Sequence, residues 1–281
     1  MLEADELRRI EPNVRGVRAL HVPETSVIDF KLVGAKLVDE LRARGAQFRF
    51  GARLTGVHAR DGGVTLKTTA GDVAAGAFLA CAGLQSDRVA KLAGIEPALR
   101  IVPFRGDYWQ LRHTDPDLIR GLVYPVPDPA FPFLGVHFTR GADERVTIGP
   151  NAVPALAREG YRRSALSIKD AADAFMWPGF FRLARRYART GLAEIWRDTV
   201  KRAAVKDMQR YVPSISGRDV VRAGCGIRAQ AMTRDGSLVD DFVIEDGPAS
   251  VHVLNAPSPA ATSCLAIGAV VAERAAQRFG F

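Results

Sequence analysis

The run GAFLACAG, residues 76–83, decides the fold of this chain. It consists of small and apolar residues and ends in glycine, a pattern typical of a strand that is buried on both faces. Ser86 and Asp87 follow it and favour the N-cap of a helix that reaches Ala93. We therefore expect a buried strand that leads into a helix, as in the core of an α/β domain.

The flanking segments extend this pattern toward both ends of the chain. Apolar residues recur at helical spacing over residues 30–44, and Gly45 follows them as a stop signal. Short alternating segments punctuated by glycine then predict hairpins, at residues 46–50, 53–59 and 64–69. The C-terminal part repeats the theme, with strands near residues 220–227, 238–245 and 251–254 and a helix over about 260–278.

The middle of the chain has a different character. Its first half predicts strands, at residues 99–111, 121–126, 133–139 and 145–149. A helical block follows from Ser167 to about Ala204. This order indicates one discontinuous domain that is interrupted by another, an α/β fold with α+β character whose inserted part holds an antiparallel sheet.

Positive charge is concentrated in one segment. The formal net charge of the chain is +8, and residues 155–210 contain 13 Lys and Arg against 6 Asp and Glu. Such a segment is typical of a solvated helical face, and the alternative is docking on anionic lipid. Nucleic acid is a weaker alternative because the segment has no recognisable binding motif and its aromatic residues lie in an apolar cluster.

Cysteine spacing and the first residues bear on location. The chain has three widely spaced cysteines without a C-x-x-C pair, which argues against a disulfide framework or a zinc site and favours a reducing, cytoplasmic compartment. The N-terminal stretch MLEADELRRIEP lacks the layout of a secretory signal. The longest uncharged run, residues 251–272, includes two prolines and several polar residues, so it predicts strand, turn and helix and no bilayer span.

Four separated motifs share one resemblance. They are IVPFRGDY at 101–108, YPVPDP at 124–129, FLGVHFTR at 133–140 and NAPSPAAT at 255–262. In this order they resemble the L-2-hydroxyglutarate oxidase/dehydrogenase family, which belongs to the FAD-dependent, D-amino-acid-oxidase-like (DAO-like) oxidoreductases. The resemblance runs over essentially the whole chain.

One departure from the family concerns the cofactor cradle. Such flavoproteins begin with a strand, a G-x-G-x-x-G turn and a helix that holds the FAD pyrophosphate, and this chain contains no G-x-G-x-x-G. We therefore expect a truncated chain without the N-terminal βαβ unit, through a misassigned start, a truncated gene or a split gene. The resemblance then implies four segments: a substrate-domain remnant or linker at 1–27, FAD-binding parts at 28–99 and 206–281, and a substrate domain with a basic helical extension at 100–205.

The resemblance also implies which residues meet the flavin. Ala82, Gly83 and Ser86 correspond to the strand end beside FAD, where glycine would let the backbone approach the cofactor. Gly226 begins the G-x-R stretch of the superfamily. The backbone of a helix start could stabilise negative charge on the reduced flavin. The residues of that turn and helix start are Asn255, Ser258, Pro259, Ala260, Ala261 and Thr262.

Candidate substrate residues come from the other motifs. Arg228 is the expected clamp for a substrate carboxylate, because a guanidinium can donate two parallel hydrogen bonds. His137 is the expected general base, since imidazole titrates near neutrality, and the alternative is a structural histidine. A diacid needs a second contact, for which Arg105 with its neighbour Gly106 is the first choice. The other candidates for that contact are Tyr108, Tyr124 and Arg140.

The resemblance implies an FAD-dependent 2-hydroxy acid dehydrogenase. It would oxidise the dicarboxylate L-2-hydroxyglutarate to 2-oxoglutarate by hydride transfer to flavin, and pass electrons to a quinone, another membrane acceptor or oxygen. The basic segment 155–210 could then place a cytoplasmic flavoprotein at the inner face of the membrane. Two alternatives stay open: oxidation of an amino acid or N-methyl amine by the same fold, and a fragment that is not catalytically competent alone.

Overall fold

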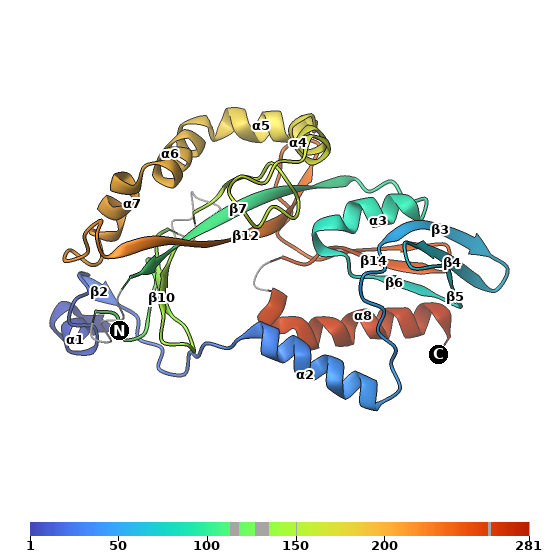
Figure 1. Ribbon diagram of the computed structural model, residues 1–281, viewed down its shortest axis with the longest axis horizontal. Coiled ribbons are helices and arrows are strands. Elements are labelled where there is room, and N and C mark those ends of the chain that lie inside the picture. Colours follow the sequence, from blue (N-terminus) through green and yellow to red (C-terminus); the bar gives the residue numbers. More distant parts are fainter. Residues whose placement is uncertain (113–117, 127–134, 150, 258–259, 281) are drawn as a thin grey trace.

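Two layered bodies share one long antiparallel strand pair. The structure is a computed structural model that describes residues 1–112, 118–126, 135–149, 151–257 and 260–280. Strand β7 (Leu99–Leu111) and strand β12 (Val220–Thr233) run through both bodies, as Figure 1 shows. The predicted strand at 99–111 is confirmed to the residue, whereas β12 continues six residues beyond the predicted end at Ile227.

The larger sheet has six strands, and this pair provides two of them. Strand β12 lies along one edge of β7, and the other edge of β7 pairs first with β11 and then with β10. The predicted antiparallel sheet is confirmed. Its remaining strands are β8 (Leu122–Val123), β9 (Phe138–Arg140), β10 (Val146–Ile148) and β11 (Val153–Pro154).

Four helices form an arch over this sheet, in agreement with the predicted helical block (Figure 1). Ser167 caps the first helix by accepting a hydrogen bond from the Asp170 backbone, and Pro178 begins the second. The last helix packs Val205 and Met208 into the core of the sheet. The helices are α4 (Ile168–Phe175), α5 (Pro178–Arg186), α6 (Ala188–Thr199) and α7 (Lys201–Met208).

The second body contains two three-stranded sheets. In one of them β14 lies between antiparallel β13 and parallel β6, and α3 packs Ala90 against Leu254 of β14. The strands are β3 (Leu54–Arg60), β4 (Gly63–Thr68), β5 (Val73–Ala75), β6 (Phe78–Ala80), β13 (Val243–Gly247) and β14 (Ser250–Asn255). The helices are α2 (Phe30–Ala43), the 3₁₀ turn η1 (Gly83–Gln85), α3 (Ser86–Leu92), the 3₁₀ turn η2 (Ala260–Ser263) and α8 (Cys264–Phe279).

A small N-terminal unit completes the described chain. Strand β1 (Leu2–Glu3) pairs with β2 (Arg18–Ala19), and α1 (Ala4–Ile10) lies between them. Leu7 of α1 reaches the core of the larger sheet. The segment 1–27 therefore contacts the inserted part of the molecule.

Three local expectations are wrong. Strand β6 is not buried on both faces, because it lies at the edge of its sheet and Leu79 is 42% exposed. Residues 46–50 form no strand, since the pairing partners of β3 lie C-terminal to it. Ser86 does not cap α3, because its hydroxyl donates to the Leu254 carbonyl 2.8 Å away and the cap position is Gln85.

Helices α2 and α8 form where they are predicted but bury little. Asp29 caps α2 through the Lys31 backbone, and none of the α2 side chains is buried. In α8 the buried residues are Val271 and Ala275, while Leu265 and Val270 are exposed. In the described part of the chain, no helix combines the length and apolar character that crossing a bilayer requires.

A glycine pair tests the packing of the arch on the long strand pair. A Cβ at Gly179 of α5 would lie 2.1 Å from the Thr233 carbonyl oxygen at the end of β12. Gly179→Ala should therefore cost about 1–3 kcal/mol in the free energy of unfolding. Gly191→Ala in α6 meets no atom within 4 Å and should instead stabilise the chain by about 0.5–1 kcal/mol. Denaturant unfolding measures both, and equal effects of the two substitutions would contradict this packing.

Candidate active site

The larger sheet has one face closed by the helical arch. Ile148 of β10 pairs with Trp109 of β7 on one side and with Phe138 of β9 on the other. The three side chains are buried in one core together with residues of α7. Successive side chains of a strand point to opposite faces, so the neighbouring row of residues faces away from this core.

That neighbouring row carries the candidate catalytic residues. In register it consists of Tyr108, Gly149, His137 and Tyr124, and the Gly149 amide donates to the His137 carbonyl over 3.0 Å. The ring of His137 stacks on that of Tyr124, with centroids 4.6 Å apart and planes 14° from parallel. The structure therefore brings together side chains from three motifs that are separated in the sequence.

His137 is held in a form that can accept a proton. Its Nδ1 lies 3.0 Å from the Gly135 carbonyl oxygen, which only accepts, so Nδ1 carries the hydrogen and Nε2 has the free lone pair. Burial lowers the pKa of His137, the hydrogen bond to Gly135 raises it, and the positive charge of Arg228 lowers it. His137 is 9% exposed, and its lowered pKa favours the neutral imidazole.

Arg228 enters the same site from the long strand β12. Its register partner is Phe104, and Gly226 pairs with Gly106, so Arg228 lies on the face of the ribbon that also carries Tyr108. Burial raises the pKa of the Tyr108 phenol, and the charge of Arg228 opposes this effect. Arg228 thus acts electrostatically on both Tyr108 and His137, while Tyr108 stays a protonated hydrogen-bond donor.

Arg105 is not brought into this group. It lies on the other face of β7, where its guanidinium pairs with Asp107 at 2.9 Å and with Asp198 of α6 at 3.1 Å. The glycine beside it, Gly106, pairs with Gly226 on the face of Tyr108. Arg105 therefore holds α6 against the sheet and has no place among the substrate contacts proposed below.

A pocket lies where the predicted flavin stretches converge. Its volume is about 180 Å³, and its lining joins the end of β6, the end of β14 and the residue after Arg228. Gly83 has a φ of +49°, a left-handed conformation that favours glycine, and a Cβ there would meet no atom within 4 Å. The lining residues are Cys81, Gly83, Ala229, Val253, Leu254, Asn255 and Ala256.

The side chains of two predicted cofactor residues donate hydrogen bonds to the backbone near this pocket. The Asn255 side chain is buried and donates to the Val239 and Asp241 carbonyls at 3.2 and 2.8 Å. Ser86 donates to the Leu254 carbonyl and ties the start of α3 to β14. Both side chains thereby fix the backbone around the pocket.

The helix start after the pocket is also where the sequence predicts it. Ala260, Ala261 and Thr262 form the 3₁₀ turn η2, which leads directly into α8. Ser258 and Pro259 lie outside the described residues, as do Pro127–Pro129 and Phe133–Leu134 of the other motifs. Ala82 precedes Gly83 at the start of η1.

The pocket fits one part of a flavin cofactor. Its lining residues are mostly small or apolar, as suits a planar ring, and its volume suits one ring system better than a whole dinucleotide. The backbone of Gly83 and the end of β14 at Asn255 would hold the ring portion of FAD.

Comparison with known proteins identifies the family of this chain. The family model described as FAD dependent oxidoreductase matches residues 1–274. The chain belongs to this family. Relatives named L-2-hydroxyglutarate dehydrogenase include that of Indibacter alkaliphilus, 42% identical over 98% of this chain and 69% of that protein. The relatives from Escherichia coli K12 and from human mitochondria are 39% and 38% identical to this chain, and the matches cover 65% and 64% of their lengths. The predicted resemblance is confirmed, and the chain spans about two thirds of the length of these relatives.

Solved structures show the same fold at low sequence identity. L-alpha-glycerophosphate oxidase from Mycoplasma pneumoniae with FAD bound matches all of this chain and 64% of its own, with a TM-score of 0.70 and 17% identity. Glycine oxidase from Geobacillus kaustophilus matches 97% of this chain and 62% of its own, with a TM-score of 0.62 and 15% identity. The predicted FAD-linked oxidoreductase fold is confirmed.

Sequence reasoning missed two features of the site. The stacking of Tyr124 on His137 follows from strand register, which no local pattern reveals. The pairing of Asp107 with Arg105 could have been noticed, because residues two apart on a strand share a face.

The electrostatic effect of Arg228 on His137 can be measured. Arg228→Gln removes a positive charge that disfavours the imidazolium, so the pKa of His137 should rise. Arg145→Gln, on the exposed β9–β10 hairpin, removes the same charge at a distance and should leave the pKa of His137 unchanged. Histidine ring resonances followed by NMR against pH report both, and an unchanged or lowered pKa in Arg228→Gln would contradict the site.

Proposed function

We propose that this chain provides the substrate site of an enzyme that oxidises L-2-hydroxyglutarate to 2-oxoglutarate. One observation carries the proposal: Arg228 acts electrostatically on Tyr108 and on His137, whose Nε2 is free, and the next residue, Ala229, lines the candidate flavin pocket. FAD, when bound, supplies the acceptor for the hydride that leaves the α-carbon. The names of the relatives support the same substrate.

Three side chains divide the work on the substrate. Arg228 binds the carboxylate next to the reacting carbon through its planar fork of donors. Nε2 of His137 takes the hydroxyl proton as the C–H bond breaks, since Nδ1 is already occupied by Gly135. The Tyr108 phenol stays protonated and donates to the same end of the substrate.

The distal carboxylate needs a second contact in the same row. Tyr124 offers its hydroxyl, which also lies 3.2 Å from Thr139 Oγ1, and its ring is fixed by the stack on His137. Arg140 is paired with Glu144 on the neighbouring hairpin. Arg140 shares a strand face with Phe138 and not with His137, so we assign the distal contact to Tyr124.

Anaerobic flavin reduction tests the function. With FAD added, L-2-hydroxyglutarate should bleach the flavin absorbance of the chain, and glycine or sarcosine should not. His137→Asn should slow bleaching by about 10²–10⁴-fold, as expected for loss of a general base. The rate should also fall as the pH drops through the pKa of His137, which lies below its ordinary 6.5, because the protonated ring cannot accept a proton.

The matched control for this experiment is His58→Asn, at an exposed site on β3 in the other body. It should bleach at the original rate. Bleaching by glycine or sarcosine alone would contradict the proposed substrate. A chain that binds FAD only when the upstream residues of a relative are restored would instead support the fragment alternative.

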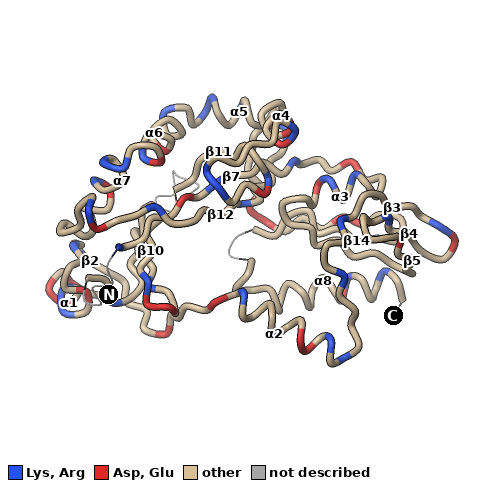
Figure 2. Tube along the Cα trace, in the orientation of Figure 1, with Lys and Arg blue, Asp and Glu red and all other residues tan. Residues whose placement is uncertain are grey.

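The helical arch offers a second proposal, which concerns the partner of the reaction. We propose that it docks on an anionic membrane surface, where a quinone or another membrane acceptor could receive the electrons. Large apolar side chains are exposed on α4, α5 and α6, and Figure 2 shows Lys and Arg recurring along α5 and α6. The exposed apolar residues are Ile168, Met176, Phe181, Leu192, Ile195 and Trp196. Interspersed apolar and basic residues suit the headgroup region of a bilayer.

Vesicle sedimentation tests the arch. The chain should bind vesicles rich in phosphatidylserine and not neutral vesicles, and salt should weaken the binding. Replacing Phe181, Leu192 and Trp196 together by serine should abolish it. Replacing the equally exposed Val17 and Leu20 by serine, on the N-terminal segment, should have no effect. Equal binding by both variants would contradict a role for the arch.

A further inference from the structure

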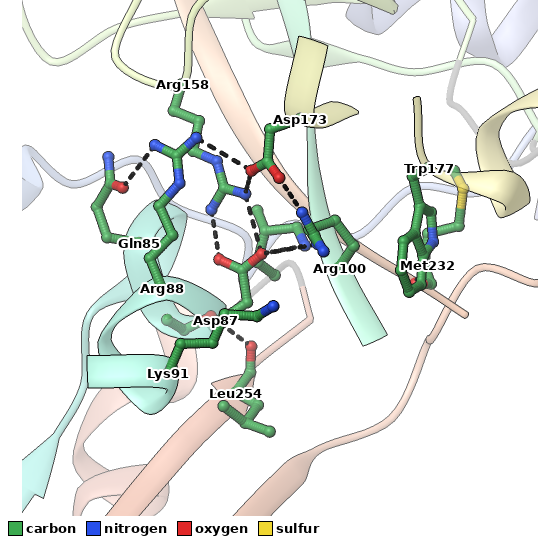
Figure 3. A network of polar contacts seen from close by, with 12 residues as sticks. Gln85, Asp87, Arg88, Lys91, Arg100, Arg158, Asp173, Trp177, Met232 and Leu254 are labelled. Atoms are coloured by element: carbon green, nitrogen blue, oxygen red, sulfur yellow. Dashed lines mark hydrogen bonds and ion pairs between the residues drawn. The ribbon is translucent and has the colours of Figure 1, made fainter. Parts of the chain in front are cut away.

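A buried ion pair is hydrogen-bonded to the turn that lines the candidate flavin pocket. Asp87 is the second residue of α3, and Arg158 belongs to the segment between β11 and α4. Each residue is 1% exposed. Figure 3 shows their side chains facing each other, with the two terminal nitrogens of Arg158 directed at the two carboxylate oxygens.

The pair is fixed by further hydrogen bonds on both sides. Asp87 Oδ2 lies 2.9 Å from Arg158 Nη2 and accepts from the Ile101 amide of β7 at 3.1 Å. Arg158 Nη2 also donates to Asp173 of α4 at 2.8 Å, and its backbone amide donates to Asp170 at 3.0 Å. The Arg158 guanidinium is thus held in one orientation between the two bodies.

From this orientation Arg158 reaches the turn that lines the pocket. Its Nη1 donates to the Leu84 carbonyl over 2.8 Å, and Leu84 directly follows Gly83, the left-handed residue of the pocket wall. The next residues of both segments also meet, since Gln85 Nε2 donates to Glu159 Oε1 at 2.9 Å. The segment that carries Arg158 is therefore joined to η1 by two hydrogen bonds, at Leu84 and at Gln85.

Stability alone does not explain a buried pair of this kind. Removing two charges from water is costly, and well-packed apolar residues of similar volume are often as stabilising. In addition, Nε of Arg158 is buried without a hydrogen-bond partner among the described residues. The ion pair provides a directed hydrogen-bond donor to the Leu84 carbonyl, which a pair of apolar residues could not provide.

We propose that Arg158, held by Asp87, is a positioning residue that sets the Gly83–Gln85 turn for the flavin. It fixes the backbone of the turn through Leu84 and so fixes the pocket wall on which the cofactor rests. Through the same guanidinium, the inserted part of the chain is connected to the flavin wall.

The first test needs no cofactor. Arg158→Lys keeps the charge but cannot donate to Asp87 and Leu84 with one planar fork. The Gln85 amide, which donates to the Ala82 carbonyl at 2.9 Å, should exchange its hydrogen about tenfold faster, as for loss of a charged hydrogen bond. Asp87→Asn retains an acceptor for Ile101 and should show the same change if Arg158→Lys fails to fold.

The control is Arg100→Lys. Arg100 belongs to the same network through Asp173 and, over 3.8 Å, through Asp87 Oδ2, and it stacks on Trp177. Among the described residues it has no hydrogen bond or ion pair with residues 83–85. Arg100→Lys should lower the melting temperature of the chain without changing the hydrogen-exchange rate of the Gln85 amide. Equal exchange in the turn of both variants, or no change in Arg158→Lys, would overturn the proposal.

The second test rests on the proposed function because it requires FAD. Titration of the chain with FAD should give a dissociation constant about tenfold higher for Arg158→Lys and unchanged for Arg100→Lys. If the original chain binds no FAD, the proposed function fails, while the exchange experiment still decides the role of Arg158. Equal FAD affinity of the original chain and Arg158→Lys would overturn the positioning of the cofactor.

Discussion

The antiparallel pairing of β7 with β12 supports the rest of the molecule. At one end of the pair, Ile101 and Ala231 lie in the core with α3 and β14, and at the other end Trp109 and Val220 lie in the core with α7. Neither body has a core without these strands. Because the pairing is continuous in register from Leu99 to Asp107, the flavin pocket and the catalytic row are held at a fixed separation along one ribbon.

The alternation of side chains along this ribbon separates chemistry from scaffolding. One face presents Tyr108 and Arg228 to His137, and the other face buries Arg105 and Asp107 against Asp198 of α6. Two arginines of the same ribbon, Arg228 and Arg105, therefore have different surroundings because their side chains point to opposite faces. Ala229, the residue after Arg228 on the same strand, belongs to the wall of the candidate flavin pocket.

Much of this arrangement could be predicted from local patterns, and the remainder depends on long-range pairing. The bounds of β7 agree with the predicted strand although the run includes Pro103, Gly106 and Asp107. The face of His137 follows from its alternation with apolar neighbours. The side of the sheet on which Arg105 lies could not be predicted, because alternation does not say which face is covered. The exposure of Leu79 could not be predicted either, because a central strand and an edge strand can have the same apolar sequence pattern.

We propose that the β7–β12 ribbon brings the flavin wall and the substrate site together. A crystal structure of the chain with FAD and 2-oxoglutarate tests it most directly. The account predicts a flavin ring against Gly83 and Asn255, a product carboxylate on Arg228, and the product oxygen within hydrogen-bond distance of His137 Nε2. A product bound on the face of Arg105, or a flavin ring away from Gly83, would contradict it.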